Sequence, residues 1–338
     1  MLALRPLPSL ARATVRTPIL LRCLSTSSPH LASQFKPIER LTVFGAGLMG
    51  AGIAQVAAQN GVKVVMTDVS EGAVENGRQI ITKSLTRIAR KQSPDDESAQ
   101  QRFISSVFSN LATTTHAAKA VASADLVIEA IVENLATKQE LFRRLDELAP
   151  RETAFASNTS SLSITKIAEG CSDARKARFA GFHAFNPVPQ MKLVELVATE
   201  RTSRETMDAL LDLSKRMKKV PVQCKDTPGF IVNRLLVPYM LEAIRMVERG
   251  DASAEDVDTA MKLGAGLPMG PLELSDFVGL DTLSHIARGW RDERVSTGEI
   301  PAESVAAVEM LEGLVKVGKL GRKSGEGFFK CEFGQLIF

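Results

Sequence analysis

The first two thirds of the chain alternate short apolar runs with longer amphipathic stretches, which is typical of strands and helices that follow one another. Residues 41–44 are an apolar run of strand-forming side chains, 51–59 a run of small helix-forming ones, and 63–68 a second apolar run. The uncharged stretch 41–62 is long enough to cross a bilayer, but its glycines and amide side chains fit a strand, a turn and a helix better. We therefore expect a β-α-β unit at the start of the fold.

The remaining pattern divides the chain into two domains. We expect a charged helical stretch at 71–119, a helix at 138–149, and further strands at 125–133, 153–160, 178–187 and 192–198. From residue 226 the pattern becomes helical, with helix starts at 227–229 and at Ser253, and a break at 264–271. The sequence thus predicts an α/β domain over 36–225 and an all-α domain over 226–338.

Residues 1–35 contain four Arg and no acidic residue, the composition of a mitochondrial transit peptide. We therefore expect a protein of the mitochondrial matrix; an N-terminal tail without a targeting role is the alternative. Without those four Arg, the 42 basic residues fall to 38 against 39 acidic ones. A nearly neutral body with one Trp and one Tyr argues against a nucleic-acid partner.

The four cysteines are widely separated, and none forms a Cys-x-x-Cys pair or a cluster with histidine. The sequence therefore predicts neither a metal site nor a disulfide framework.

The sequence GAGLMG at 45–50 is a G-x-G-x-x-G motif between an expected strand and an expected helix. In that context the glycines permit a tight turn and let the backbone approach a pyrophosphate, which the helix N-terminus then binds. The candidate cofactor-binding residues of this loop are Gly45, Gly47, Leu48, Met49 and Gly50. The domain over 36–225 is therefore expected to be a Rossmann-like dinucleotide-binding domain.

Asp68 ends the second expected strand, where a carboxylate can bind the ribose hydroxyls and would repel a 2′-phosphate. This position favours NAD over NADP. A helix-capping role is the alternative.

His183 differs from the other three histidines because it ends an apolar strand. Glu195 interrupts the apolar run 193–197, where a carboxylate is costly unless it is paired. Two strands joined by a short loop can bring these side chains together, and the carboxylate would then leave one imidazole nitrogen free as a base. Hydride transfer from an alcohol needs such a base. A buried histidine bonded to main chain and a solvent-facing glutamate would give the same pattern, so both interpretations stay open.

Five motifs in order carry a resemblance to a known family: the glycine loop, SNTSSL (157–162), HAFNPVP (183–189), MKLVE (191–195) and KDTPGFIVNR (225–234). Over 38–330 the sequence resembles the L-3-hydroxyacyl-CoA dehydrogenases, which include mitochondrial enzymes and bacterial 3-hydroxybutyryl-CoA dehydrogenases. The resemblance implies NAD-dependent oxidation of L-3-hydroxyacyl-CoA to 3-oxoacyl-CoA in fatty-acid β-oxidation. It also implies a homodimer, formed by a helical C-terminal domain that closes over the cleft.

The resemblance assigns roles to single residues. It implies that His183 is the general base and Glu195 its partner, and that Ser160, Asn186 and Asn233 hold the substrate and polarise its carbonyl. It places a second group along the cofactor, namely Glu133, Lys138, Asn158, Ser160 and Asn186. Ser84 and Lys91 match positions that contact CoA, and Ser160 and Asn233 also belong to the substrate site.

The chain departs from the family pattern in three places. The spacing from Ser160 to His183 is longer, which we interpret as a surface-loop insertion around 171–176, and Ala184 and Leu267 stand where aromatic residues are common. Two other classes compete: a hydroxyacid dehydrogenase that uses a catalytic lysine, and a non-catalytic dinucleotide-binding protein. Acyl-chain preference, physiological direction and regulatory partners stay open.

Overall fold

The structure is a computed structural model that describes residues 35–330. The expected transit peptide, with Cys23 and His30, lies outside these residues except for Phe35, and Cys331 also lies outside them.

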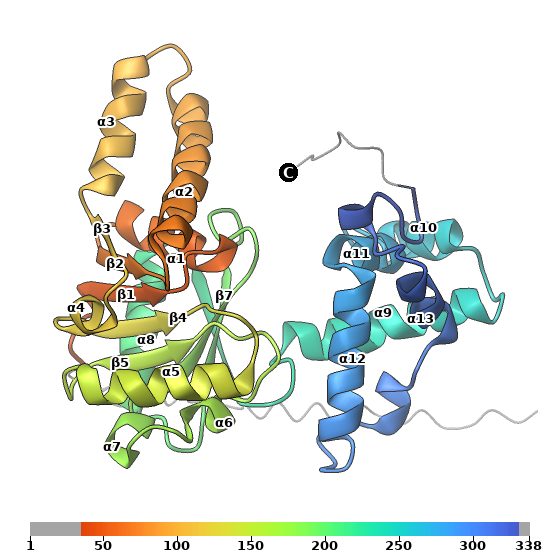
Figure 1. Ribbon diagram of the computed structural model, residues 1–338. Helices are drawn as coiled ribbons and strands as arrows, with labels where there is room; N and C mark the ends of the chain where they lie inside the picture. The colour runs from red at the N-terminus through yellow and green to blue at the C-terminus, as the bar shows by residue number, and fades with distance from the viewer. Residues whose placement is uncertain (1–34, 331–338) are drawn as a thin grey trace, which may run out of the picture. The chain divides into compact units, whose positions relative to one another are not determined.

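The α/β part is built on one eight-stranded sheet in the order β3-β2-β1-β4-β5-β6-β7-β8 (Figure 1). Strands β1 to β6 are all parallel to one another. Their order in the sheet, β3-β2-β1-β4-β5-β6, is that of a doubly wound dinucleotide-binding fold. β7 pairs antiparallel with β6, and β8 pairs parallel with β7. The strands are β1 (Arg40–Phe44), β2 (Lys63–Thr67), β3 (Leu111–Thr114), β4 (Leu126–Glu129), β5 (Ala154–Ser157), β6 (Phe179–Ala184), β7 (Leu193–Ala198) and β8 (Val220–Lys225).

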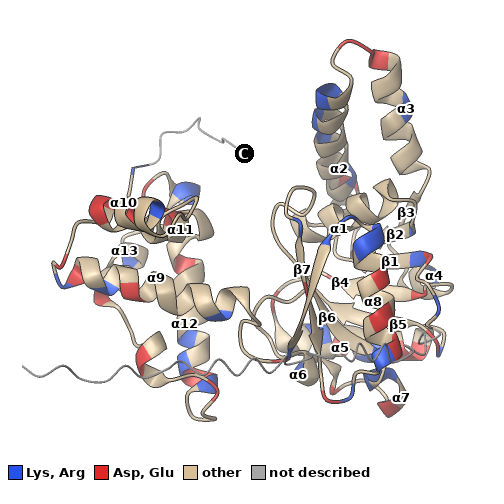
Figure 2. Cartoon of the chain, turned by 180° about the vertical axis from the view of Figure 1, so that it is seen from behind, with Lys and Arg blue, Asp and Glu red and all other residues tan. Residues whose placement is uncertain are grey.

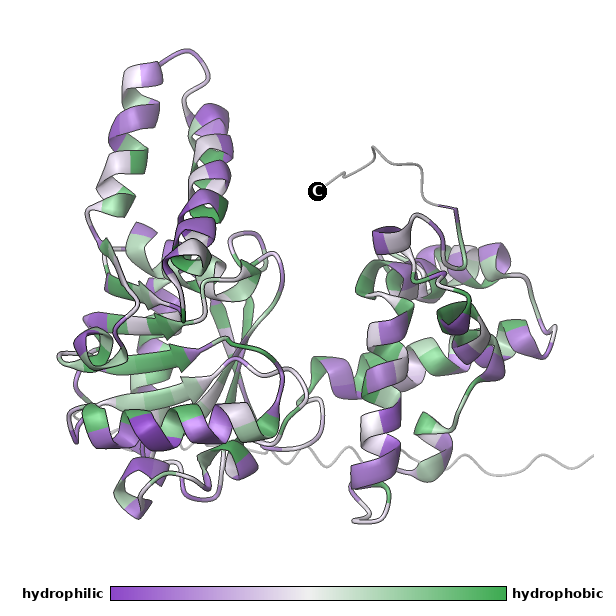
Figure 3. Ribbon diagram, in the orientation of Figure 1, coloured by the Kyte–Doolittle hydropathy of each residue, from purple (hydrophilic) through white to green (hydrophobic). Residues whose placement is uncertain are grey.

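Helices cover both faces of this sheet and so bury its inner strands on both sides, whereas the edge strand β8 stays largely exposed. Figure 3 shows hydrophobic residues along the strands. One apolar cluster joins the sheet to side chains of α1, α2 and α8, and another joins it to α4, α5 and α6. The helices are α1 (Leu48–Gln59), α2 (Glu71–Gln92), α3 (Glu97–Phe108), α4 (Ala117–Val121), α5 (Leu135–Leu148), α6 (Ile164–Ala168), α7 (Asp173–Lys176) and α8 (Arg204–Arg216).

The prediction of a helical stretch at 71–119 is partly wrong. It contains two helices that pack against each other, α2 and α3, and then the strand β3, which pairs with β2. β3 is only four residues long, so its period of two cannot be distinguished from a helix end in the sequence. The expected strands 125–133 and 153–160 are also shorter, because the chain leaves the sheet after Glu129 and after Ser157.

The segment around 171–176, interpreted above as an insertion, is not simply a surface loop, since it contains α7 and buries Arg175 to 3% exposure. The guanidinium pairs with Asp146 at 2.8 Å, bonds carbonyls at the end of α5, and lies 4.3 Å over the ring of Phe155. This segment therefore anchors the end of α5.

The C-terminal part is helical and has its own core around Leu241, Ile244, Leu283 and Trp290. Its elements are α9 (Val232–Glu248), α10 (Ala254–Gly264), α11 (Pro271–Val278), α12 (Leu280–Arg294), α13 (Glu309–Lys316) and the 3₁₀ turns η1 (Ala302–Val305) and η2 (Arg322–Ser324).

Of the two expected helix starts in this part, one is confirmed and one is wrong. Ser253 caps α10 by accepting a hydrogen bond from the Asp256 N–H at 3.1 Å. The start at 227–229 is wrong, because Gly229 and Phe230 have φ values of 75° and 54°, so α9 begins at Val232. In residues 35–330 no helix is long and apolar enough to cross a membrane.

Candidate active site

The glycine loop between β1 and α1 has the geometry that its motif predicts. Gly45 has φ 103°, and a Cβ there would lie 2.4 Å from the Ala130 carbonyl oxygen. A Cβ on Gly50 would lie 1.8 Å from the Gly45 oxygen, whereas one on Gly47 would meet nothing within 4 Å. Gly45 and Gly50 therefore permit close packing, and Gly47 leaves an open backbone face.

That open face leads to the N-terminus of α1. The helix has no side-chain cap and no acidic residue in its first turn, and Leu48 is 66% exposed while Met49 packs against the core. Free N–H groups at a helix start bind phosphate well. These residues fit the pyrophosphate of a dinucleotide.

Asp68 lies just beyond β2, beside the glycine loop. Its Oδ2 accepts from the Ala46 N–H and its Oδ1 from the Val69 N–H, both at 2.7 Å. Ser70, not Asp68, caps α2, so the helix-capping alternative is wrong. Asp68 therefore places a carboxylate at the end of the second strand, next to the phosphate-binding turn.

His183 and Glu195 are direct partners in the antiparallel pairing of β6 with β7. His183 Nδ1 lies 2.7 Å from Glu195 Oε2, and the two residues are 5% and 1% exposed. Within residues 35–330 His183 Nε2 makes no hydrogen bond, so it is the nitrogen left for a substrate. The rings of Phe185 and Phe230 lie 4.4 Å and 5.5 Å from the imidazole, centroid to centroid.

The other carboxylate oxygen of Glu195 is also bound. Oε1 accepts from the backbone N–H groups of Ile231 and Val232, at 3.0 and 2.9 Å, where α9 begins. Burial by itself would raise the pKa of Glu195, but the hydrogen bonds from His183 and from these N–H groups outweigh it and lower that pKa. Glu195 is therefore an anion that binds His183 with one oxygen and the start of α9 with the other. The contacts of Phe185, Phe230 and the start of α9 were not predicted from the sequence.

Ser160 lies in the loop after β5, and Glu133 holds that loop. Glu133 Oε1 accepts from Thr159 Oγ1 at 2.5 Å, from Ser161 Oγ at 3.1 Å and from the Ser160 N–H at 3.2 Å. Although burial acts to raise it, the pKa of Glu133 is lowered by Lys138 and by these hydrogen bonds. Asn233 Nδ2 donates to the Ser160 carbonyl at 3.2 Å, which brings two predicted substrate residues together.

Lys138 is 1% exposed and lies beneath this loop rather than on its surface. Its ammonium pairs with Glu129 and, at 3.2 Å, with Glu133. Glu129 is fully buried and also accepts from Ser157 Oγ at 2.6 Å. Glu129 was not predicted from the sequence. The available signal was a carboxylate at the end of the apolar run of β4, because burying a carboxylate costs free energy unless a cation or hydrogen-bond donor pairs with it.

The two predicted asparagines differ in their contacts. Asn158 Oδ1 accepts from the Ala184 N–H at 2.9 Å and so joins the ends of β5 and β6, one residue from His183. Asn186 is exposed, precedes Pro187 in a cis peptide bond, and its side chain has no partner within the described part of the chain.

Ser84 and Lys91 lie two turns apart on α2, Ser84 half-buried and Lys91 exposed. No contact in residues 35–330 joins them to the His183–Glu195 pair. Figure 2 shows Lys and Arg along α2. Four of these basic side chains have no carboxylate within ion-pair distance among the described residues, namely Lys83, Arg87, Arg90 and Lys91.

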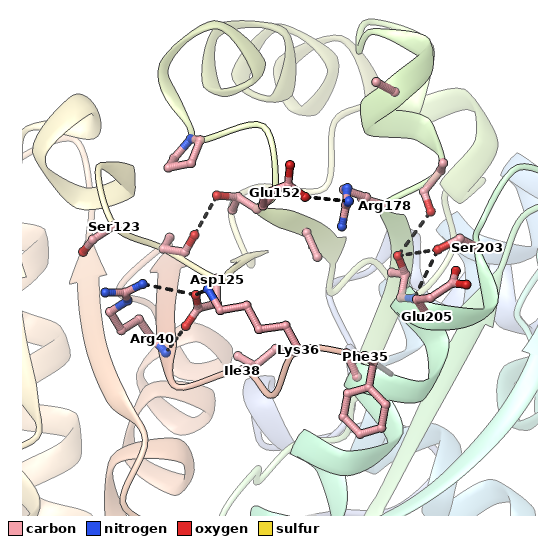
Figure 4. A pocket seen from close by; sticks show the side chains of 18 of the residues that line it. Phe35, Lys36, Ile38, Arg40, Ser123, Asp125, Glu152, Arg178, Ser203 and Glu205 are labelled. Carbon is pink, nitrogen blue, oxygen red and sulfur yellow. Dashed lines mark hydrogen bonds and ion pairs between the residues drawn. The ribbon is translucent and has the colours of Figure 1, made fainter. Parts of the chain in front are cut away.

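A cavity of about 820 Å³ lies at the amino ends of the strands, away from the His183–Glu195 pair (Figure 4). It is lined by charged groups that pair with one another, Arg40 with Asp125 and Arg178 with Glu152. None of the predicted catalytic residues lines it. Ligands of open α/β sheets bind at the carboxyl ends of the strands, so this cavity is not the active site.

A doubly wound sheet with an open glycine loop, and a buried His–Glu pair at the carboxyl end of a neighbouring strand, define a dinucleotide-dependent dehydrogenase. Comparison with known proteins identifies which one. The family model "3-hydroxyacyl-CoA dehydrogenase, NAD binding domain" matches residues 40–227, and "3-hydroxyacyl-CoA dehydrogenase, C-terminal domain" matches 229–331. The chain belongs to the family of NAD-dependent 3-hydroxyacyl-CoA dehydrogenases.

Individual relatives agree with this assignment. The chain is 53% identical to the mitochondrial hydroxyacyl-coenzyme A dehydrogenase of Sus scrofa, over 92% of this chain and 97% of that one, and the human protein gives the same values. The crystal structure of (S)-3-hydroxybutyryl-CoA dehydrogenase from Ralstonia eutropha has a TM-score of 0.79 at 38% identity and covers 87% of this chain and 99% of its own. The predicted family, fold class, enzyme class and NAD cofactor are confirmed.

Proposed function

We propose that this dehydrogenase oxidises L-3-hydroxyacyl-CoA to 3-oxoacyl-CoA in the β-oxidation of the mitochondrial matrix, with His183 as its general base. The observation that carries the proposal is the 2.7 Å contact between His183 Nδ1 and Glu195 Oε2. With its proton on Nδ1 donated to Glu195, the imidazole offers Nε2 to the substrate hydroxyl. The carboxylate then stabilises the imidazolium that forms when Nε2 takes the proton.

The cofactor would lie along the carboxyl ends of β1, β2 and β4. The pyrophosphate would meet the backbone of Gly45–Gly50 and the first turn of α1, and Asp68 would bind the ribose hydroxyls. NAD, when bound, accepts the hydride that leaves carbon 3 of the substrate. Asn158 and Glu133 would line its nicotinamide side, and Lys138 would act through Glu133, because Lys138 itself is enclosed.

Ser160, Asn186 and Asn233 would hold the substrate oxygen opposite His183. The support is the link from Asn233 Nδ2 to the Ser160 carbonyl, which ties the start of α9 to the loop after β5. Hydrogen bonds aimed at the oxygen on carbon 3 stabilise the charge that develops there during proton and hydride transfer.

The CoA part of the substrate would bind along α2, through Ser84 and Lys91. The support is the set of unpaired basic side chains on that helix, which suits phosphate groups. The helical region 226–338 would form the homodimer, and 36–225 would form the nucleotide-binding domain. The mitochondrial names of the pig and human relatives support the location, as does the basic, acid-free segment 1–35.

Oxidation of NADH by the purified protein with acetoacetyl-CoA tests the activity, and a series of acyl-chain lengths ranks its substrates. The expected result is turnover with NADH that His183→Gln abolishes. Turnover that persists in His183→Gln would contradict the role of this base. Sedimentation of the purified protein tests the dimer.

A further inference from the structure

Lys219 carries a buried charge that the reaction described above does not use. The residue lies between α8 and β8, directly after Lys218, whose φ of 57° turns the chain inward. Lys219 is 8% exposed, and its backbone N–H donates to the Ser214 carbonyl at 2.9 Å. Its side chain therefore points into the protein from a turn that is fixed by the backbone.

The ammonium contacts two backbone carbonyls of a single loop. Lys219 Nζ donates to the Val188 oxygen and, at 2.7 Å, to the Met191 oxygen. Both belong to the connection 185–192 between β6 and β7, which begins two residues after His183. The same connection carries Asn186 and Phe185, the ring beside the imidazole.

The same loop also packs on α1, the helix that follows the glycine loop. A Cβ built on Gly52 of α1 would lie 2.8 Å from Val188 Cβ, so the two backbones approach as closely as a glycine permits. Val188 therefore contacts α1 through its side chain and Lys219 through its carbonyl oxygen.

The charge of Lys219 is not neutralised by a carboxylate. Among the residues from 35 to 330 no acidic oxygen lies within ion-pair distance of its Nζ, and burial lowers the pKa of this lysine. Enclosing an ammonium without a counter-ion costs free energy, and an apolar side chain could fill the same space at a lower cost. What an apolar side chain cannot do is bind two carbonyl oxygens at once.

We propose that Lys219 is a positioning residue for the dehydrogenase reaction: its ammonium fixes the loop 185–192 so that Asn186 and Phe185 meet the reacting groups beside His183. The proposal rests on the role proposed above for Asn186. Displacement of a positioning group by about 1 Å can lower a rate by about 10²-fold. The proposed grip on the cofactor lies mainly in the glycine loop and Asp68, so we expect a loosened loop to lower kcat more than cofactor affinity.

The experiment compares Lys219→Met, which keeps the length and removes the donors, with Lys219→Arg, which keeps them. Lys218→Met is the matched control, because it removes an exposed ammonium from the neighbouring position. We expect Lys219→Met to lower kcat about 10- to 100-fold with an NADH Kd within about threefold of wild type, Lys219→Arg to restore part of that loss, and Lys218→Met to leave kcat unchanged. If Lys219→Met does not fold, Lys219→Gln takes its place, with a smaller expected loss of kcat because it keeps an uncharged N–H donor.

A double variant with Asn186→Ala separates this proposal from the proposed function. If Lys219 acts through Asn186, Lys219→Met costs little further kcat when Asn186 is already Ala. An Asn186→Ala variant with normal kcat would contradict the role of Asn186 alone. The positioning role of Lys219 is overturned if Lys219→Met keeps wild-type kcat while only its Tm falls, or if Asn186→Ala by itself lowers kcat and the loss from Lys219→Met is equal in both backgrounds.

Discussion

Glu195 faces His183 across the β6–β7 ladder with one carboxylate oxygen, while its other oxygen receives the first two free N–H groups at the start of α9. One buried side chain therefore orients the imidazole and fixes the point at which the chain leaves the α/β part. A change at Glu195 should affect both catalysis and stability, and the two effects can be measured separately.

We expect Glu195→Gln to lower kcat by about 10²–10⁴, because the loss of a general base typically costs that much. The amide oxygen can still accept from Ile231 and Val232, which leaves the amide NH₂ facing His183 Nδ1. That arrangement favours the tautomer with its proton on Nε2, which cannot accept the substrate proton.

Steady-state kinetics with NADH affinity measured in parallel check this expectation. Glu200 is an exposed carboxylate after the same strand, so Glu200→Gln is the control and should leave kcat and NADH affinity unchanged. A kcat for Glu195→Gln within a few-fold of wild type would contradict the pairing, and an equal loss of NADH binding would indicate a structural role.

The same substitution should change the stability at acid pH. Because the folded protein lowers the pKa of Glu195 below its usual value of 4.5, ionised Glu195 stabilises the fold above that value. The contribution is lost as the pH falls through the lowered pKa. Urea unfolding between pH 6 and pH 3 should therefore show a shallower decline of unfolding free energy in Glu195→Gln than in wild type. Parallel curves would refute this.

Asp68→Ala should weaken NADH binding and narrow the preference over NADPH, because it removes a carboxylate that repels a 2′-phosphate. Asp68 also accepts from the Ala46 N–H, so Asp68→Asn, which keeps an acceptor there, separates the ribose contact from support of the loop. Fluorescence titrations with both cofactors decide between them. Unchanged affinities in both variants would show that Asp68 does not contact the ribose.

Lys138→Met should destabilise the fold by about 3–5 kcal/mol, because it leaves the fully buried Glu129 without its cation. It should also raise the KM for acetoacetyl-CoA, since Glu133 would no longer be fixed under the Ser160 loop. Chemical unfolding and kinetics measure the two effects, with the exposed Lys166→Met as control. A stability within about 1 kcal/mol of wild type would show that the enclosed ion pairs contribute little.

Arg175→Met should lower the free energy of unfolding by about 3–5 kcal/mol, as Lys138→Met does. It leaves Asp146 without its cation and the carbonyls at the end of α5 without their donor. Its neighbour Lys176 makes only a surface pair with Asp173, so Lys176→Met should cost less than about 1 kcal/mol. Thermal unfolding compares the two. Equal shifts in Tm would mean that Arg175 does not anchor the end of α5. Activity at low temperature should be retained by both.

The sequence by itself determined the class of the fold, because the features that specify it are local. A G-x-G-x-x-G turn needs glycines at fixed positions, and strands buried on both faces read as apolar runs. The same reasoning found His183 and Glu195, since each is a polar residue in an apolar strand and the short connection allows only an antiparallel neighbour. It failed where an element was too short for its period to be recognised, as at β3, and where positive φ values delayed the start of α9.

Only the tertiary structure decided which groups share a charge. Glu129, Lys138 and Glu133 are separated by helix and loop, and their pairing depends on how α5 packs beneath the end of β4. The second carboxylate oxygen of Glu195 and the ammonium of Lys219 both bind backbone groups. Every residue has such groups, so the sequence gives no sign of which ones will be bound. Residue types reveal that a buried charge must be satisfied; the three-dimensional packing alone determines the partner, because hydrogen bonds reach about 3 Å in space whatever the distance along the chain.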